Sequence, residues 1–323
     1  MATPMVPAGI GPDDIGRLYR SMRRIRRVEE AVAEVYPTDR IKSPVHLSIG
    51  QEAVSVGVID VLREDDVVAG SYRGHAVYLA KGADLPAMIA EMYGKATGCA
   101  AGKGGSMHLI GAERNVLGAS AVVGTHIPIA LGHALAAKRE GAGRVVAVFF
   151  GDGATEEGVF HESLNFAALH RLPILFVCEN NFFAIHTPLA KRWATDRLCE
   201  RVATYGMPAH RLAEPDVFAL RGLAAGLVAE MRAGGGPAFL ECHTWRWREH
   251  VGPAEDYAAG YRPRAEMERW EAGDQVARLG ALLPDAGRAA IDADIEREIA
   301  EAFAFAEASP FPDEEELFTH VFA

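Results

Sequence analysis

The chain has 323 residues, 49% of them hydrophobic and 24% charged, which is ample for a large buried core. Its 33 Lys and Arg residues against 44 Asp and Glu residues give a net charge of −11, and no run of five basic residues occurs. This charge disfavours a nucleic-acid or anionic-membrane binder. No stretch reaches eighteen apolar residues and the N-terminus does not resemble a signal peptide, so we expect a cytoplasmic enzyme.

The N-terminal region is expected to form one long helix at residues 13–36. Ile25, Val28 and Val32 fall on one side of that helix, as an amphipathic pattern requires. Its arginine cluster is expected to be solvated or to form internal ion pairs rather than to bind a partner. A glycine-rich stretch follows at 94–121, and it either crosses a ligand or merely connects elements.

Two apolar runs, at 145–150 and 174–178, are expected to form strands. The segment between them predicts a helix with a broad apolar face, which ends at Pro173. Strand, glycine turn, helix and strand make a βαβ unit. Further along, residues 218–233 predict another amphipathic helix and residues 238–245 another strand.

No internal repeat or low-complexity linker divides the chain. We therefore expect a single α/β domain over residues 1–323, with a largely parallel central sheet flanked by helices. A helical arm at about 1–40 and a helical, acidic extension at about 263–323 complete the prediction.

Two polar fragments follow the strands of the βαβ unit, Gly151-Asp152-Gly153 and Asn180-Asn181. Open α/β sheets bind ligands at the carboxyl ends of their strands. Glycines let the backbone approach a phosphate, and a carboxylate beside phosphates suggests a bridging Mg²⁺ with oxygen ligands. The alternative is a plain glycine turn after a buried strand. The dinucleotide fingerprint G-x-G-x-x-G is not met, because the next glycine is Gly158.

With these fragments, the chain resembles the α subunits of thiamine-diphosphate-dependent 2-oxoacid dehydrogenases, the decarboxylating component of pyruvate-dehydrogenase-type complexes. The resemblance implies a thiamine-diphosphate-binding α/β fold. It spans nearly the whole chain through HLSIGQEAVSVGV (46–58), SYRGHAVYLAKG (71–82), GKGGSMHL (102–109), VVGTHIPIALGHALA (122–136), the unit at 151–181 and SPFPDEEELFTHVF (309–322).

The resemblance implies a diphosphate site in which Tyr72 and Arg73 hold the phosphates and Arg73 pairs two of their oxygens. The other reading of Arg73 is a surface salt bridge. Gly153 and Ala154 would add backbone contacts to the diphosphate.

By the same resemblance, Asp152, Asn181 and the backbone carbonyl of Phe183 would complete the Mg²⁺ site. Ala121 and Val123 match positions that line the aminopyrimidine of the cofactor, with plain core packing as the alternative.

Two histidines are catalytic candidates. His250 matches the family's active-site loop histidine and His46 matches one that meets substrate in the pyruvate-like branch. Each has a surface or core role as its alternative. The family varies at His75, which is left unassigned.

Two features depart from the family's usual pattern. Glu249 and Val251 replace the Gly and Ser that usually flank the loop histidine. That Ser is the site of kinase control in some relatives, so such control is not expected at Val251. The carboxylate beside His250 is a candidate determinant of a different substrate. The glutamate that activates the aminopyrimidine comes, in this family, from a separate β subunit, so this chain should be half of an active site.

The leading functional prediction is an α subunit, in an α2β2 heterotetramer, that decarboxylates a pyruvate-like 2-oxoacid and passes the acyl group to a lipoyl-bearing acyltransferase. The alternative is the same machinery acting on another carbonyl compound such as acetoin. More distant alternatives are a Rossmann-type NAD-dependent oxidoreductase, which lacks its fingerprint here, and a non-catalytic subunit, against which Tyr72, Arg73, Asp152 and Asn181 argue.

Overall fold

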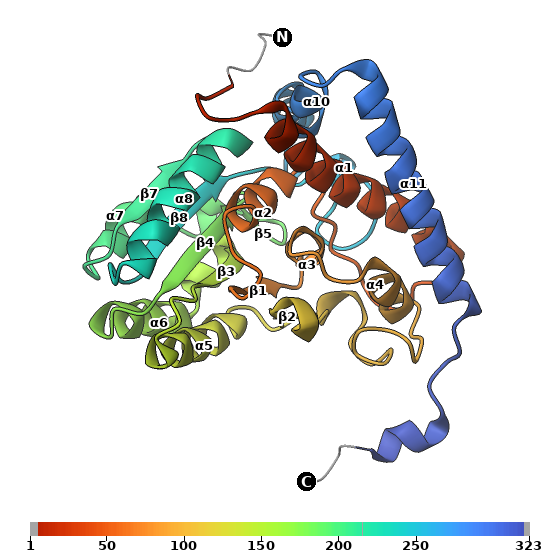
Figure 1. The fold of residues 1–323 in the computed structure, drawn as a ribbon, viewed down its shortest axis with the longest axis horizontal. Coiled ribbons are helices and arrows are strands. Elements are labelled where there is room, and N and C mark those ends of the chain that lie inside the picture. The colour runs from red at the N-terminus through yellow and green to blue at the C-terminus, as the bar shows by residue number, and fades with distance from the viewer. Residues whose placement is uncertain (1–5, 215, 320–323) are drawn as a thin grey trace.

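A parallel sheet runs through the centre of the molecule, with helices on both faces (Figure 1). The computed structural model describes residues 6–214 and 216–319. Within them, the sheet has the strand order β2-β1-β3-β4-β8-β7, and all its pairings are parallel. This confirms the predicted α/β class. The strands are β1 (Val67–Ser71), β2 (Val116–Ser120), β3 (Val146–Gly151), β4 (Ile174–Asn180), β7 (Ala209–Leu212) and β8 (Ala238–His243), and a separate hairpin pairs β5 (Phe183–Ala184) with β6 (Thr187–Pro188).

Alternate side chains of each central strand point to opposite faces and join different cores. In β4, Leu175 and Val177 pack in the core formed with α1, α2 and α8, whereas Phe176 and Cys178 pack in the core formed with α5, α6 and α7. No described helix is both long and apolar enough to cross a membrane. The helices are α1 (Pro12–Val35), α2 (Glu52–Ile59), α3 (His75–Ala80), α4 (Leu85–Met92), α5 (His126–Glu140), α6 (Gly158–Leu169), α7 (Leu198–Ala203), α8 (Val217–Arg232), α9 (Arg264–Ala272), α10 (Gln275–Gly280) and α11 (Asp285–Ala308).

The arginines of α1 form ion pairs with α11, which lies beside α1 (Figure 1). Arg24 and Glu298 are joined at 2.6 Å, and Arg27 and Glu296 at 2.6 Å. Deeper in the fold, Arg26 pairs with the buried Glu52 of α2 at 2.5 Å. The predicted internal ion pairs are thus confirmed, and they join the two terminal helices to the body.

The predicted βαβ unit is observed as β3, α6 and β4, with a 3-10 turn at Asp152–Glu156 between β3 and α6. The glycine-rich stretch at 94–121 was predicted as a loop, yet its end forms β2 at one edge of the sheet. In β2 only Val116 is buried and Gly118 has a φ of 130°, so the alternating apolar pattern of a strand is missing. The motif at 309–322 lies within the described residues only as far as Thr319.

The direction of the chain connections reverses between β1 and β3. From β1 the chain crosses to β2 on one side, whereas β3 leads to β4 on the other. In open α/β sheets, such a point opens a crevice at the carboxyl ends of the two strands, and ligands bind there. The fold therefore places the candidate site just beyond Ser71 and Gly151.

Candidate active site

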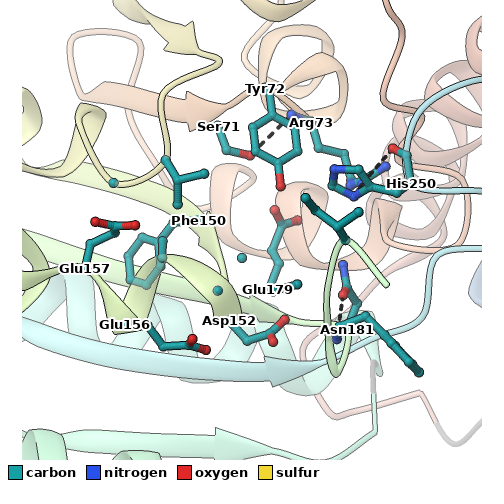
Figure 2. A pocket seen from close by; sticks show the side chains of 18 of the residues that line it. Ser71, Tyr72, Arg73, Phe150, Asp152, Glu156, Glu157, Glu179, Asn181 and His250 are labelled. Atoms are coloured by element: carbon teal, nitrogen blue, oxygen red, sulfur yellow. Dashed lines mark hydrogen bonds between the residues drawn. The ribbon is translucent and has the colours of Figure 1, made fainter. Parts of the chain in front are cut away.

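Three neighbouring strands end at one cavity of about 260 Å³. Tyr72 and Arg73 follow β1, Asp152 follows β3, and Asn181 follows β4. Figure 2 shows these side chains around the same space, with His250 reaching it from a distant loop. The predicted residues that line the cavity are Tyr72, Arg73, Val123, Asp152, Gly153, Ala154, Asn181, Phe183 and His250.

Asp152 is almost completely buried, with 1% of its surface exposed. Its Oδ2 atom accepts a hydrogen bond from Arg192, which also pairs with Glu156. Its Oδ1 atom is buried and has no hydrogen-bond partner within residues 6–214 and 216–319. Burial raises the pKa of Asp152, and the charge of Arg192 opposes that rise. A buried carboxylate oxygen without a partner is what a bound cation would complete.

Asn181 lies at a sharp turn after β4. Its Oδ1 accepts a hydrogen bond from the Phe183 N–H at 3.2 Å, and its Nδ2 donates to Gln51 Oε1 at 3.3 Å. Phe182 has a φ of 69°, in the left-handed region, and this conformation turns the chain back toward the cavity at Phe183. The backbone of Phe183 therefore lies beside the Asn181 carboxamide, and both residues line the cavity.

The donor atoms in this corner fit a magnesium ion, because carboxylate, carboxamide and carbonyl oxygens are its preferred ligands. In the part of the chain that the structure describes, no group of three or more His, Cys, Asp or Glu side chains is placed to hold a metal. The candidate ligands, which are Asp152, Asn181 and the Phe183 carbonyl, do not form such a group, because among these three only Asp152 has a charged side chain.

Arg73 is a buried residue with 6% of its surface exposed, which rules out the surface salt bridge. Its Nη1 donates to the Leu47 carbonyl at 2.7 Å, and its Nη2 donates to the His250 carbonyl at 3.2 Å. Burial lowers the pKa of Arg73 to about 10, so the guanidinium stays charged at neutral pH. The residue joins β1 to the segments that carry His46 and His250.

A fully buried polar network supports the turn that presents Tyr72 and Arg73. His75, at the start of α3, contacts Glu29 through Nδ1 at 3.1 Å and Ser106 through Nε2 at 2.8 Å. The Ser48 hydroxyl donates to the same Glu29 oxygen at 2.7 Å. His75 thus has a structural environment, and the glycine-rich stretch reaches the site region through Ser106.

His250 and His46 form an aromatic cluster with Tyr72. The ring centroids of His46 and His250 are 5.1 Å apart, and those of His46 and Tyr72 are 4.5 Å apart. Burial, reinforced by the charge of Arg73, lowers the pKa of His250 to about 2 and that of His46 to about 3. Both imidazoles are therefore neutral at physiological pH. His46 belongs to this cluster but is not among the described residues that line the cavity.

The loop of His250 is anchored at its base by buried charges. Asp256 accepts hydrogen bonds from Arg246 at 3.1 Å and from Arg262 at 2.7 Å. Arg246 also donates to the Ile185 carbonyl at 3.0 Å, next to the turn after β4. These contacts hold the two ends of the loop together and attach them to Ile185, which lines the cavity.

Ala121 and Val123 differ in position. Val123 lines the cavity with 41% of its surface exposed, whereas Ala121 is not one of the described lining residues. The exposed apolar side chain of Val123 suits a flat apolar ligand group better than core packing.

Sequence reasoning missed Glu179, Gln51 and Arg192. Glu179 lines the cavity with 5% of its surface exposed, and burial raises its pKa to about 8. A charged residue near the end of an apolar strand, directly before Asn180-Asn181, was a usable signal for it. Gln51 and Arg192 carried no such signal, because each meets the site only through the folded chain.

Comparisons with known proteins agree with this geometry. The family model for the dehydrogenase E1 component matches residues 20–315. The α subunit of acetoin:2,6-dichlorophenolindophenol oxidoreductase from Bacillus subtilis is 39% identical over 94% of this chain and 92% of its own length. The pyruvate dehydrogenase E1 component α subunit from Zymomonas mobilis is 38% identical over 98% of this chain and 92% of its own length.

Among solved structures, a transketolase from Leishmania mexicana shares the fold, with a TM-score of 0.57 at 16% identity. The match covers 91% of this chain and 46% of that structure, so this chain spans about half the length of the transketolase. The family model and the relatives confirm the resemblance seen in the motifs: the chain belongs to the dehydrogenase E1 component family.

Proposed function

We propose that this chain is the α subunit of a thiamine-diphosphate- and Mg²⁺-dependent 2-oxoacid dehydrogenase. It would decarboxylate a pyruvate-like 2-oxoacid and pass the acyl group to a lipoyl-bearing acyltransferase. The observation that carries the proposal is the Oδ1 atom of Asp152, directly after the carboxyl end of β3. This atom is buried and has no hydrogen-bond partner among the described residues. The carboxyl groups of Asp152, Glu156, Glu157 and Glu179 line this cavity with Arg73, and Arg192 pairs with Asp152 and Glu156 beside it. A phosphate ligand next to the Asp152 carboxylate is favoured only with a cation between them.

The residues divide between the metal and the diphosphate. Asp152, Asn181 and the carbonyl of Phe183 would hold Mg²⁺. Tyr72 and Arg73, with the backbone of Gly153 and Ala154, would hold the diphosphate. Val123, which lines the cavity, would contact the aminopyrimidine. When bound, thiamine diphosphate supplies a thiazolium carbanion that adds to the substrate carbonyl and accepts the electrons left by decarboxylation.

His250 would orient the substrate through a defined nitrogen. Its Nδ1 lies 3.3 Å from Arg73 Nη2. Because a guanidinium only donates, Nδ1 is the acceptor and the ring proton belongs on Nε2. His250 would therefore offer an N–H to a substrate oxygen, and the neutral His46 contacts its ring edge to face.

A β subunit would complete the active site. The relatives are named as α subunits, and the family resemblance assigns the activating glutamate to the partner chain. An α2β2 assembly is the corresponding prediction. The isolated chain should then bind the cofactor weakly and catalyse nothing.

Acetoin is the second candidate substrate, since α subunits of acetoin oxidoreductases from Bacillus subtilis and Cupriavidus necator are 39% and 38% identical to this chain. The Rossmann-type alternative has no support from the family match.

The decisive experiment is co-expression with a β partner, followed by a screen of 2-oxoacids and acetoin with an artificial electron acceptor. Turnover that requires Mg²⁺ and thiamine diphosphate is expected from the assembled protein and not from either chain alone. Full turnover by this chain alone, or none from the assembly with any compound, would contradict the proposal.

A further inference from the structure

Glu249 precedes His250, and its side chain bonds back to the same turn instead of lining the cavity. Its Oε1 accepts a hydrogen bond from the Ala254 N–H at 3.0 Å, and its own N–H donates to the Ala254 carbonyl at 2.9 Å. The two bonds join the ends of the turn 249–254 and enclose His250 within it. Glu249 is not one of the described residues that line the cavity.

The closed turn is held against the body of the protein by two further contacts. The Gly252 N–H donates to the Val45 carbonyl at 2.8 Å, directly before His46. Arg73 donates to the His250 carbonyl at 3.2 Å. The turn that carries one candidate histidine is therefore bonded to the segment that carries the other.

The Glu249 carboxylate packs directly on Gly252. Gly252 has a φ of 109°, and a Cβ atom built there would lie 2.3 Å from Glu249 Oε1. A side chain at position 252 would therefore displace the carboxylate from its present place, and the positive φ also favours glycine there. The absence of a side chain at Gly252 therefore makes room for the hydrogen bond between Glu249 and Ala254.

We propose that Glu249 is a positioning residue, a carboxylate clasp that holds the turn 249–254 closed and fixes His250 at the cavity. The inference rests on the proposed role of His250. Closure of the turn restricts the backbone of His250 before substrate arrives, and a preset orientation favours turnover. A residue without a side-chain acceptor at this position leaves the Ala254 N–H without its partner.

The test uses the enzyme assembled with its β partner and two kinds of Glu249 variant. Glu249→Ala removes the acceptor, whereas Glu249→Gln keeps an oxygen at the same place. Glu255→Ala is the matched control, because Glu255 is an exposed carboxylate on the same loop that pairs with Arg264 at 3.2 Å.

Hydrogen–deuterium exchange of the peptide covering 249–256 reports the clasp without any turnover. In Glu249→Ala, exchange at Gly252 and Ala254 should be roughly five- to tenfold faster, as expected for the loss of one hydrogen bond. Glu249→Gln and Glu255→Ala should exchange like the wild type. Wild-type exchange in Glu249→Ala overturns the clasp, even if the proposed substrate class is wrong.

Turnover then tests whether the clasp acts through His250. Glu249→Ala should lower kcat roughly tenfold, less than the ~10²-fold that a displaced catalytic group costs, with cofactor affinity unchanged. Glu249→Gln should restore kcat. In a His250→Ala background, Glu249→Ala should have no further effect on kcat. An equal loss in both backgrounds, or a Gln variant as slow as Ala, overturns the positioning role.

Discussion

Arg73 holds His250 at two points: its Nη2 lies 3.2 Å from the His250 carbonyl oxygen and 3.3 Å from His250 Nδ1. The residues are 177 positions apart in sequence. A residue proposed to bind the diphosphate is thus in direct contact with the residue proposed to orient the substrate. The Arg73 guanidinium therefore holds His250 in place, in addition to its proposed contact with the diphosphate.

Arg73→Lys should damage both functions. A lysine keeps the charge but cannot donate at once to the Leu47 carbonyl and to His250. We expect turnover to fall by about 10–100-fold, the effect of losing a charge-assisted hydrogen bond, with weaker cofactor binding. Calorimetry and turnover on the assembled enzyme measure the two effects, and Arg114→Lys, at an exposed arginine, is the control. A variant with intact affinity and turnover would separate Arg73 from both roles.

His250→Ala should cut turnover by ~10²–10⁴-fold, the usual range for one acid–base group. Affinity for thiamine diphosphate should barely change, because the diphosphate is held by other residues. Both quantities are to be measured on the same assembled variant, with His210→Ala as the control, since His210 is exposed on β7. Joint loss of turnover and affinity would indicate a structural histidine instead.

Asp152→Ala should abolish cofactor binding in the presence of Mg²⁺. The substitution removes the candidate charged ligand and leaves Arg192 without its buried partner. Calorimetry with Mg²⁺ and thiamine diphosphate on the assembled enzyme checks this, with Asp65→Ala as a surface control and circular dichroism as a check of folding. Unchanged affinity would refute the metal assignment.

The two neutral histidines should make the chain less stable in mild acid. In the unfolded state each takes up a proton near pH 6.5, whereas in the folded state His46 does so only near pH 3 and His250 near pH 2. As pH falls from 6.5, the unfolded state binds more protons, so the free energy of unfolding decreases by up to about 1.4 kcal/mol per pH unit for each histidine.

Urea unfolding of the purified chain between pH 7 and pH 5 measures this effect. His250→Asn should show a smaller loss of stability over that range than the wild type, whereas His210→Asn should follow the wild type. Parallel pH profiles for all three proteins would mean that His250 is not held neutral.

Local sequence was sufficient for the elements whose signals are local. The apolar runs before Gly151 and Asn180 and the apolar helical face between them predicted β3, α6 and β4, because periodicity and breakers act within a few residues. The polar fragments at the strand ends then placed Asp152 and Asn181 at one edge of a parallel sheet. The short edge strand β2 was not predicted, because it forms through its pairing with β1 and has no strand pattern of its own.

Only the tertiary structure decided which distant residues meet and how they are charged. The Gln51 contact with Asn181 joins residues 130 positions apart, and the Arg192 contact with Asp152 depends on the turn after β4. Strand order and packing determine such pairs. The same holds for Glu179, whose raised pKa comes from burial, and for Glu249, whose carboxylate accepts the Ala254 N–H and does not line the cavity. Residue type and spacing encode neither desolvation nor side-chain direction, because both arise when separate segments pack together.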